Sequence, residues 1–249
     1  MAKAVNEVQI EGRNTVFDSL NSGLEVSGVK ISANVLSDSR VKEIIKIANS
    51  KKIKVMTVRQ EEIDRESESF GAQVVLSFMK LPEERTLEQI INSKRKVTIL
   101  LLNHIDYEQN LGAIMRTAWA AGVDAIIASP NGVHEITSMV AKVSMGGAAY
   151  VPLIGMSLFQ AIDTLKRNAI RVVGVEVGMG ESLWDTELTG SVALVMGGES
   201  VGLSEPLIKA CDSMLHIPMV SGIASLNVSV ATALVMFEKN RQEQKKDPR

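Results

Sequence analysis

Three polar side chains near the end of the sequence stand where a ligand site is expected: Glu199, Ser225 and Asn227. The first follows the apolar run Val192–Met196, and the other two follow the apolar run Met214–Met219. A short apolar run bounded by glycine is typical of a buried strand in an α/β sheet, and ligands of such sheets bind at the carboxyl ends of the strands. We therefore predict that the two strand ends form one site.

The segment that carries Glu199 is rich in glycine but lacks the pattern of a phosphate-binding loop. Its sequence, GGESVG over residues 197–202, is not GxGxxG and has no Lys-Ser/Thr pair. A carboxylate in the middle of the loop repels an anionic phosphate, so the loop suits a neutral or cationic ligand. A tight turn between a strand and a helix explains the glycines equally well.

Two further candidates, Asn110 and Arg116, lie in one short segment. Asn110 is a suitable N-cap for a helix over residues 110–121, and Ser225 is a suitable N-cap for the last helix of the chain. Capping explains Ser225 without any function, but it does not explain Asn227, which is a poor helix former. The ordinary role of a residue such as Arg116 is an exposed salt bridge, and the spacing does not settle how it lies relative to Asn110.

The elements that must position these residues alternate regularly after residue 97. The predicted strands and helices are strands 97–102, 123–129, 149–154, 171–177, 192–196 and 214–219, and helices 110–121, 137–144, 157–168, 204–211 and 225–246. This alternation implies βαβ units and a mostly parallel sheet, so the fold class is α/β.

The first 80 residues have a smaller α/β pattern of their own. The predicted helices and strands are helices 11–20 and 40–50, strands 26–36, 54–59 and 73–78, and a charged surface helix or loop at 61–68. The polar stretch 81–96, with a helix at 83–91, separates the two patterns. We therefore predict domains over 1–80 and 97–249, joined by a linker over 81–96.

The composition narrows the classes of protein that are possible. The chain has 249 residues, 45% hydrophobic and 22% charged, which is ordinary for a globular enzyme. It has no apolar run of about 18 residues, and because the segment 1–7 is not apolar we expect no signal peptide. Its single cysteine, Cys211, excludes an internal disulfide. Three histidines and one cysteine show no metal-ligand spacing, so we expect no metal and a cytoplasmic location.

The charge argues against a strongly basic nucleic-acid binder, because the net charge is −2. Phosphate binding depends on local clustering rather than on the total charge, however. Basic clusters occur at 51–54 and 93–96, and taken alone they favour solvated loops beside strands.

Three motifs together resemble the SpoU (TrmH) family of SPOUT RNA methyltransferases. In chain order they are NxGxxxR over 110–116, MGGESxG over 196–202, and IPMxxGxxSLNVSVA over 217–231. They cover about residues 97–240 in the order and spacing of that family. The segment EGRNTVFDSL over 11–20 is similar to the L30e-like RNA-binding domain of the RlmB-type ribosomal members.

The resemblance implies an α/β methyltransferase domain with a C-terminal trefoil knot, which works as a homodimer. A small L30e-like α/β domain that binds the RNA substrate precedes it in the chain. Members of the family transfer a methyl group from S-adenosyl-L-methionine to a ribose 2′-hydroxyl of rRNA or tRNA. The residues at the active-site positions of the family are Asn110, Arg116, Glu199, Ser225 and Asn227. Those at its cofactor-binding positions are Met196, Gly197, Gly202, Ile217, Met219 and Leu226.

The family assigns removal of the 2′-hydroxyl proton to the arginine that matches Arg116. A guanidinium has a pKa above about 12, so stabilisation of the developing alkoxide or a contact to the adjacent phosphate is the other role open to it. Glu199 in this site is compatible with the cationic sulfonium of the cofactor.

The resemblance to RlmB-type members favours methylation of a ribose, on a guanosine, in 23S rRNA. A tRNA ribose methyltransferase is the alternative, although tRNA members of this branch often lack the N-terminal domain. A non-catalytic RNA-binding or ribosome assembly factor with the same fold is a second alternative. A nucleotide-binding Rossmann enzyme is excluded because His104-Ile-Asp-Tyr107, rather than a glycine fingerprint, follows the first strand of the larger domain.

Overall fold

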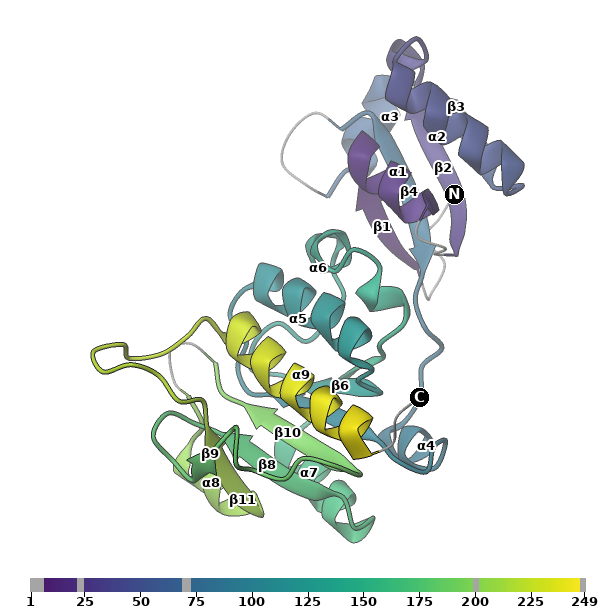
Figure 1. Cartoon of the computed structure of the whole chain (residues 1–249). Coiled ribbons are helices and arrows are strands. Elements are labelled where there is room, and N and C mark those ends of the chain that lie inside the picture. The colour runs from purple at the N-terminus through teal and green to yellow at the C-terminus, as the bar shows by residue number, and fades with distance from the viewer. Residues whose placement is uncertain (1–6, 22–24, 69–72, 199–201, 247–249) are drawn as a thin grey trace. The chain divides into compact units, whose positions relative to one another are not determined.

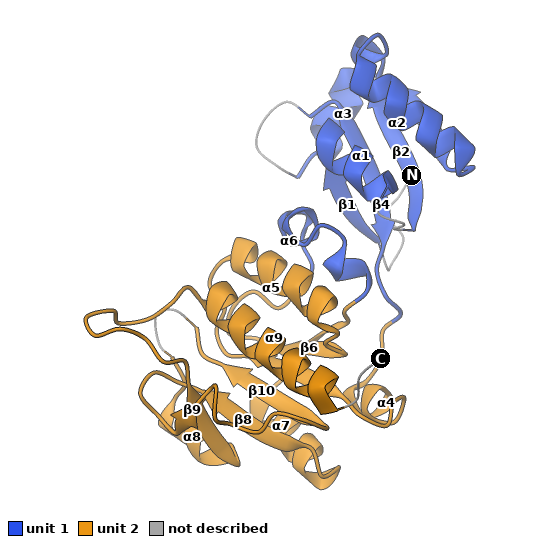
Figure 2. Ribbon diagram, viewed as in Figure 1, with its two compact units in different colours: residues 1–83, 136–150 blue, residues 84–135, 151–249 orange. Residues whose placement is uncertain are grey.

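The computed structural model describes residues 7–21, 25–68, 73–198 and 202–246 and divides into two compact units (Figures 1 and 2). The smaller unit comprises residues 1–83 and 136–150, and the larger unit comprises residues 84–135 and 151–249. The chain thus returns to the smaller unit once after leaving it. These divisions differ from the domain boundaries predicted above, because part of the polar stretch 81–96 packs in the larger unit and residues 136–150 pack in the smaller one.

The smaller unit is a four-stranded sheet, among the described residues, with helices packed on it. Its elements are β1 (Glu7–Glu11), α1 (Arg13–Asn21), β2 (Val26–Ser32), the 3₁₀ helix η1 (Ala33–Val35), α2 (Ser39–Ser50), β3 (Lys54–Val58), α3 (Gln60–Glu66), β4 (Val75–Lys80), α6 (Ser138–Val143) and the 3₁₀ helix η2 (Gly147–Ala149). The strand order is β1-β4-β2-β3; β4 is antiparallel to both neighbours, and β2 and β3 are parallel.

Polar side chains are buried between β1, β2 and α3 of this unit. Lys30 on β2 is 1% exposed, and its ammonium lies 2.5 Å from the carboxylate of Glu66 on α3. On β1, the carboxylate of Glu11 accepts hydrogen bonds from the side chain of Gln9 and from the backbone N–H of Glu68. Each buried charge therefore has a partner, which such burial requires.

The helix α6 contacts β1 in the same unit, although it is far from it in the sequence. Val140 and Ala141 of α6 are buried, and the hydroxyl of Ser138 donates a hydrogen bond to the carboxylate of Glu68. Residues 136–150 are thus an integral part of the smaller unit.

The larger unit carries the parallel sheet. Its elements are α4 (Leu87–Ile91), β5 (Thr98–Leu102), α5 (Glu108–Ala121), β6 (Ala125–Ala128), β7 (Leu153–Gly155), α7 (Leu158–Arg167), β8 (Arg171–Val175), β9 (Glu181–Ser182), β10 (Val192–Met196), α8 (Glu205–Ala210), β11 (Ser213–His216) and α9 (Val228–Lys246). The strand order is β7-β6-β5-β10-β8-β11-β9, and every pair among these described strands is parallel. The predicted α/β class with a mostly parallel sheet is confirmed, whereas the knot stays a prediction.

Helices cover both faces of this sheet, with α5 and α9 side by side on one face (Figure 1). On the other face, α4, α7 and α8 pack with the strands in one apolar core, whose side chains include Ile90, Ile99, Leu101, Leu165, Val195 and Leu207. Successive residues of β5 are all buried, since they point alternately to the two covered faces. No helix in the described ranges is long and apolar enough to span a membrane.

The C-terminal part of α9 is fixed to the start of β5 through Glu243. Its carboxylate lies 2.5 Å from the ammonium of Lys96 and 3.2 Å from that of Lys239, and it accepts a hydrogen bond from the backbone N–H of Gly190. Burial raises the pKa of Glu243, but the bonds from Lys96, Gly190 and Lys239 outweigh it and lower the pKa to about 2.

The lowered pKa predicts a pH-dependent contribution of Glu243 to stability. The contribution is fully present above the unfolded-state pKa of about 4.3 and is lost as the pH falls toward 2. We expect Glu243→Gln to lower the free energy of unfolding at pH 7 and to match the wild type near pH 2, as measured by urea denaturation. Glu205→Gln, in an exposed pair on α8, is the control and should have little effect. A difference that is the same at both pH values would contradict this prediction.

Candidate active site

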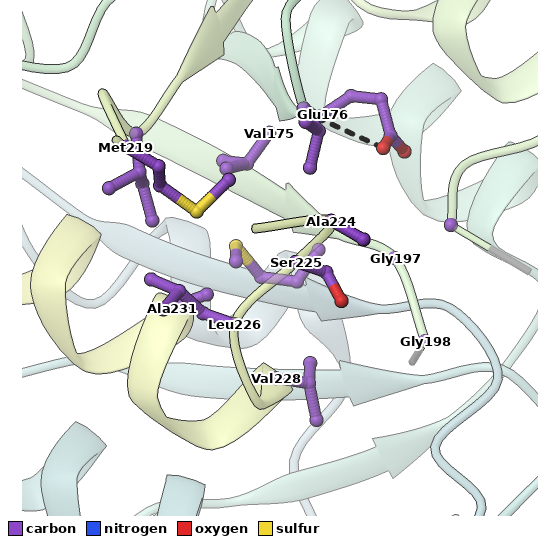
Figure 3. Close-up of a pocket in the computed structure, with 14 residues that line it drawn as sticks. Val175, Glu176, Gly197, Gly198, Met219, Ala224, Ser225, Leu226, Val228 and Ala231 are labelled. Atoms are coloured by element: carbon purple, nitrogen blue, oxygen red, sulfur yellow. Dashed lines mark hydrogen bonds between the residues drawn. The ribbon is translucent and has the colours of Figure 1, made fainter. Parts of the chain in front are cut away.

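A pocket opens at the carboxyl ends of the neighbouring parallel strands β10, β8 and β11 (Figure 3). Its volume is about 280 Å³, near the lower end of the ~300–1,000 Å³ usual for small-molecule sites. The lining residues are Val175, Glu176, Val177, Met196, Gly197, Gly198, Gly202, Ile217, Met219, Ala224, Ser225, Leu226, Val228 and Ala231.

All six residues expected to bind the cofactor lie in this lining: Met196, Gly197, Gly202, Ile217, Met219 and Leu226. The structure therefore brings together the two strand ends that the sequence analysis paired. They are not adjacent, however, because β8 lies between β10 and β11 in the sheet. Their role in binding stays a prediction.

The glycines of the pocket are required by close approaches of the backbone. A Cβ atom on Gly197 would lie 2.4 Å from the carbonyl carbon of Gly202, and one on Gly198 would lie 2.1 Å from the carbonyl oxygen of His104. Gly202 donates its N–H to the carbonyl of Gly198 at 3.0 Å, and its own carbonyl accepts from the side chain of Asn103 at 3.1 Å. The two ends of the loop are thus joined to each other and to the end of β5.

Glu176, at the end of β8, is a lining residue that the sequence analysis did not identify. Its carboxylate accepts hydrogen bonds from the backbone N–H of Val177 at 3.0 Å and from that of Leu203 at 2.7 Å. It therefore connects the end of β8 to the segment after β10. The available signal was a carboxylate directly after the apolar run 172–175, much as Glu199 follows the apolar run 192–196 after two glycines.

The cap of α9 is Asn227, not Ser225 as predicted. The helix starts at Val228, and the side-chain oxygen of Asn227 accepts hydrogen bonds from the backbone N–H and the hydroxyl of Ser229, at 3.0 and 2.6 Å. Its carbonyl accepts from the N–H of Ala231. Ser225 lies two residues earlier, is exposed, and lines the pocket.

Asn110 is also not the cap that the sequence predicted. The helix α5 begins at Glu108 after Tyr107, so Asn110 is its third residue. Its side-chain oxygen accepts a hydrogen bond from the side-chain amide of Asn227 at 3.1 Å. Because Leu226 and Val228 both line the pocket, this pair joins the starts of α5 and α9 at its edge.

The double role of Asn227 can be separated by substitution. We expect Asn227→Ala to lower the free energy of unfolding by about 1 kcal/mol, because the cap is lost. Asn227→Ser should stay within about 0.5 kcal/mol of the wild type, since serine caps a helix as well as asparagine does. Urea denaturation of the three proteins measures this difference. If both variants lost the same free energy of unfolding, the contribution of Asn227 to stability would not be its helix cap.

The two remaining candidates are placed differently. Arg116 is exposed on α5, six residues after Asn110, which corresponds to about 9 Å along the helix axis. Among the described residues, none that lines the pocket is hydrogen-bonded to it. Glu199 lies outside the described residues.

The pocket suits an organic cation with an apolar part. Methionine, isoleucine and leucine side chains provide apolar surface, glycine backbones allow close approach, and Glu176 carries a negative charge. In the described part of the chain no group of three or more His, Cys, Asp or Glu side chains could hold a metal ion. S-adenosyl-L-methionine, with its adenosine and its sulfonium, fits this set of residues.

Comparison with known proteins gives two family matches. Residues 97–237 match the model described as the SpoU rRNA Methylase family, and residues 9–81 match that described as RNA 2′-O ribose methyltransferase substrate binding. A protein from Staphylococcus saprophyticus named as a TrmH family tRNA/rRNA methyltransferase is 32% identical over 243 residues, which cover 96% of this chain and 97% of that protein.

Two solved structures show the extent of the likeness. The SpoU methyltransferase AviRb from Streptomyces viridochromogenes, in complex with the cofactor AdoMet, has a TM-score of 0.77 and 20% identity over 98% of this chain and 92% of its own. A structure described as giving insight into 2-OH methylation of C/U34 on tRNA has a TM-score of 0.54 and 26% identity. The aligned region spans 60% of this chain and 97% of that chain.

Proposed function

Since the chain belongs to the SpoU family of S-adenosylmethionine-dependent RNA ribose 2′-O-methyltransferases, we propose that its substrate is 23S rRNA and that it methylates a guanosine. The observation that carries the choice of rRNA is the match of residues 9–81 to a substrate-binding domain. The alignment with the similar structure that concerns methylation of tRNA spans 97% of that chain but only 60% of this one. That difference supports an RNA target that needs the additional domain.

The same matches support a division of labour along the chain. We assign RNA recognition to a domain over residues 1–80 and methyl transfer to one over 97–249, with 81–96 between them. The basic cluster at 51–54 lies in the first of these domains.

A map of methylated riboses tests the target. Primer extension on rRNA from cells that lack the protein should show the loss of one 2′-O-methyl stop in 23S rRNA, and the gene supplied in trans should restore it. An unchanged rRNA pattern together with a lost methyl group in tRNA would overturn the choice of rRNA and favour the tRNA alternative.

The residues of the pocket are proposed to hold the cofactor, with Met196, Ile217, Met219 and Leu226 against its adenosine part and Gly197 and Gly202 close to it. The bound cofactor supplies a methyl group on a sulfonium. Such a transfer needs the attacking oxygen to be aligned with that carbon, so the protein mainly positions the two reactants.

The catalytic roles are assigned to Asn110, Arg116, Glu199, Ser225 and Asn227. The hydrogen bond between Asn110 and Asn227 supports a shared role at the edge of the pocket, where the ribose would enter. Ser225 offers a hydroxyl within the lining. For Arg116 we propose stabilisation of the developing alkoxide rather than proton removal, because a guanidinium has a pKa above about 12.

A homodimer is proposed through α9. Val230, Leu234 and Phe237 are 49%, 38% and 49% exposed and recur at the spacing of one helix face. Burial of this face against a second copy would remove its apolar surface from water. Sedimentation should give a dimer for the wild type and a monomer for Leu234→Glu at micromolar concentration. A monomeric wild type would contradict the proposal.

A further inference from the structure

Glu176 is the only charged side chain among the described residues that line the pocket. The only other side chain there with a hydroxyl, amide or charged group is that of Ser225. The lining otherwise consists of glycine, alanine, valine, isoleucine, leucine and methionine. Among the described residues, the acceptors available to a polar hydrogen of a ligand in this pocket are therefore backbone carbonyls, Ser225 and Glu176.

The carboxylate of Glu176 is held in a fixed position. One oxygen accepts the N–H of Val177 at 3.0 Å, a bond drawn in Figure 3, and the other accepts the N–H of Leu203 at 2.7 Å. A carboxylate offers about four acceptor positions, so these two bonds leave acceptor capacity on both oxygens. A fixed acceptor can bind a ligand without a further loss of side-chain entropy.

Gly202 keeps the space beside this carboxylate open. Its φ is +64°, and a Cβ atom there would lie 2.8 Å from the second oxygen of Glu176. A larger residue at position 202 would displace the carboxylate, so the position of Glu176 depends on the glycine.

We propose that Glu176 is a further cofactor-binding residue, which accepts hydrogen bonds from the ribose hydroxyls of the adenosine part of S-adenosyl-L-methionine. A carboxylate at a strand end binds the ribose hydroxyl of NAD in this way in the Rossmann fold, whose parallel sheet has its ligand at the same edge. The two neighbouring hydroxyls of a ribose match the two oxygens of a carboxylate. The inference rests on the cofactor of the proposed function and not on which RNA is methylated.

Titration calorimetry without RNA tests this assignment. S-adenosylhomocysteine is the main probe because it has the ribose hydroxyls but no sulfonium charge. We expect Glu176→Gln to weaken both S-adenosylhomocysteine and S-adenosylmethionine by about tenfold or more, the usual effect of losing a hydrogen bond to a charged group. Glu205→Gln, an exposed carboxylate on α8, should leave both affinities unchanged.

A ligand without the hydroxyls completes the experiment. The 2′,3′-dideoxy form of S-adenosylhomocysteine should bind the wild type at least about tenfold more weakly than the parent compound, and Glu176→Gln should lose this preference. A wild type that binds both compounds equally would overturn the proposal without any variant. So would a Glu176→Gln variant that weakens S-adenosylmethionine alone, because the carboxylate would then act on the positive charge. Failure of the rRNA assignment would alter none of these affinities.

Discussion

Arg116→Ala is expected to lower the rate of methyl transfer by about 100- to 1,000-fold, the usual effect of removing one group that stabilises a developing oxyanion. The affinity for S-adenosylmethionine should change by less than about twofold, because Arg116 is exposed on α5 and is not among the described residues that line the pocket. Single-turnover transfer to RNA measures the first quantity, and calorimetry measures the second.

Two further variants make this expectation specific. Arg167→Ala removes the same charge from an exposed position on α7, where Arg167 pairs with Asp163, and should leave transfer unchanged. Arg116→Lys keeps the charge but loses the planar guanidinium, and it should recover only part of the rate. Nearly full turnover in Arg116→Lys would show that a positive charge suffices, and nearly full turnover in Arg116→Ala would remove this residue from any essential role.

Gly198→Ala is expected to abolish measurable cofactor binding and to lower the free energy of unfolding by about 3 kcal/mol, at the upper end of the usual cost of overpacking. The added methyl would lie 2.1 Å from the carbonyl oxygen of His104 and 3.1 Å from that of Asn103. These are backbone atoms that cannot rotate away, so the loop after β10 must move. Calorimetry and urea denaturation measure the two effects.

The matched control is Gly190→Ala, in the same unit. Gly190 has a φ of +80° but nothing within 4 Å of an added Cβ, so the substitution adds backbone strain of about 1 kcal/mol without a clash. Its cofactor affinity should equal that of the wild type. If Gly198→Ala also bound the cofactor normally, the close approach to His104 would not be what shapes the pocket.

The central strands of the parallel sheet could be predicted because they are buried on both faces and therefore read as continuous apolar runs, such as residues 98–102 and 192–196. The two-residue edge strand β9 (Glu181–Ser182) was not predicted, because it has no such run. The strand β1 was also missed. Its sequence EVQIE is polar at alternate positions, and these polar residues are buried against partners such as Glu68 that the sequence does not reveal. The strand predicted over 149–154 begins only at Leu153, because residues 147–149 form η2.

Within the site, residue types were easier to predict than their positions. Asparagine and serine both favour caps, but the observed helices begin at Glu108 and Val228, so Asn110 pairs with Asn227 and Ser225 lines the pocket. Glu176 was missed for a different reason. The order of strands in a sheet depends on long-range packing, and nothing local in the sequence places β8 between β10 and β11.

The return of residues 136–150 to the smaller unit limits how the N-terminal region can be gained or lost. These residues belong to the segment that matches the methylase family, yet Val140, Ala141 and Ala148 are buried within the other unit, where α6 contacts β1. Cutting the chain at residue 83 would leave these apolar side chains without their partners. A chimera that exchanges residues 1–83 must therefore exchange residues 136–150 as well, so that these side chains keep the partners they pack against.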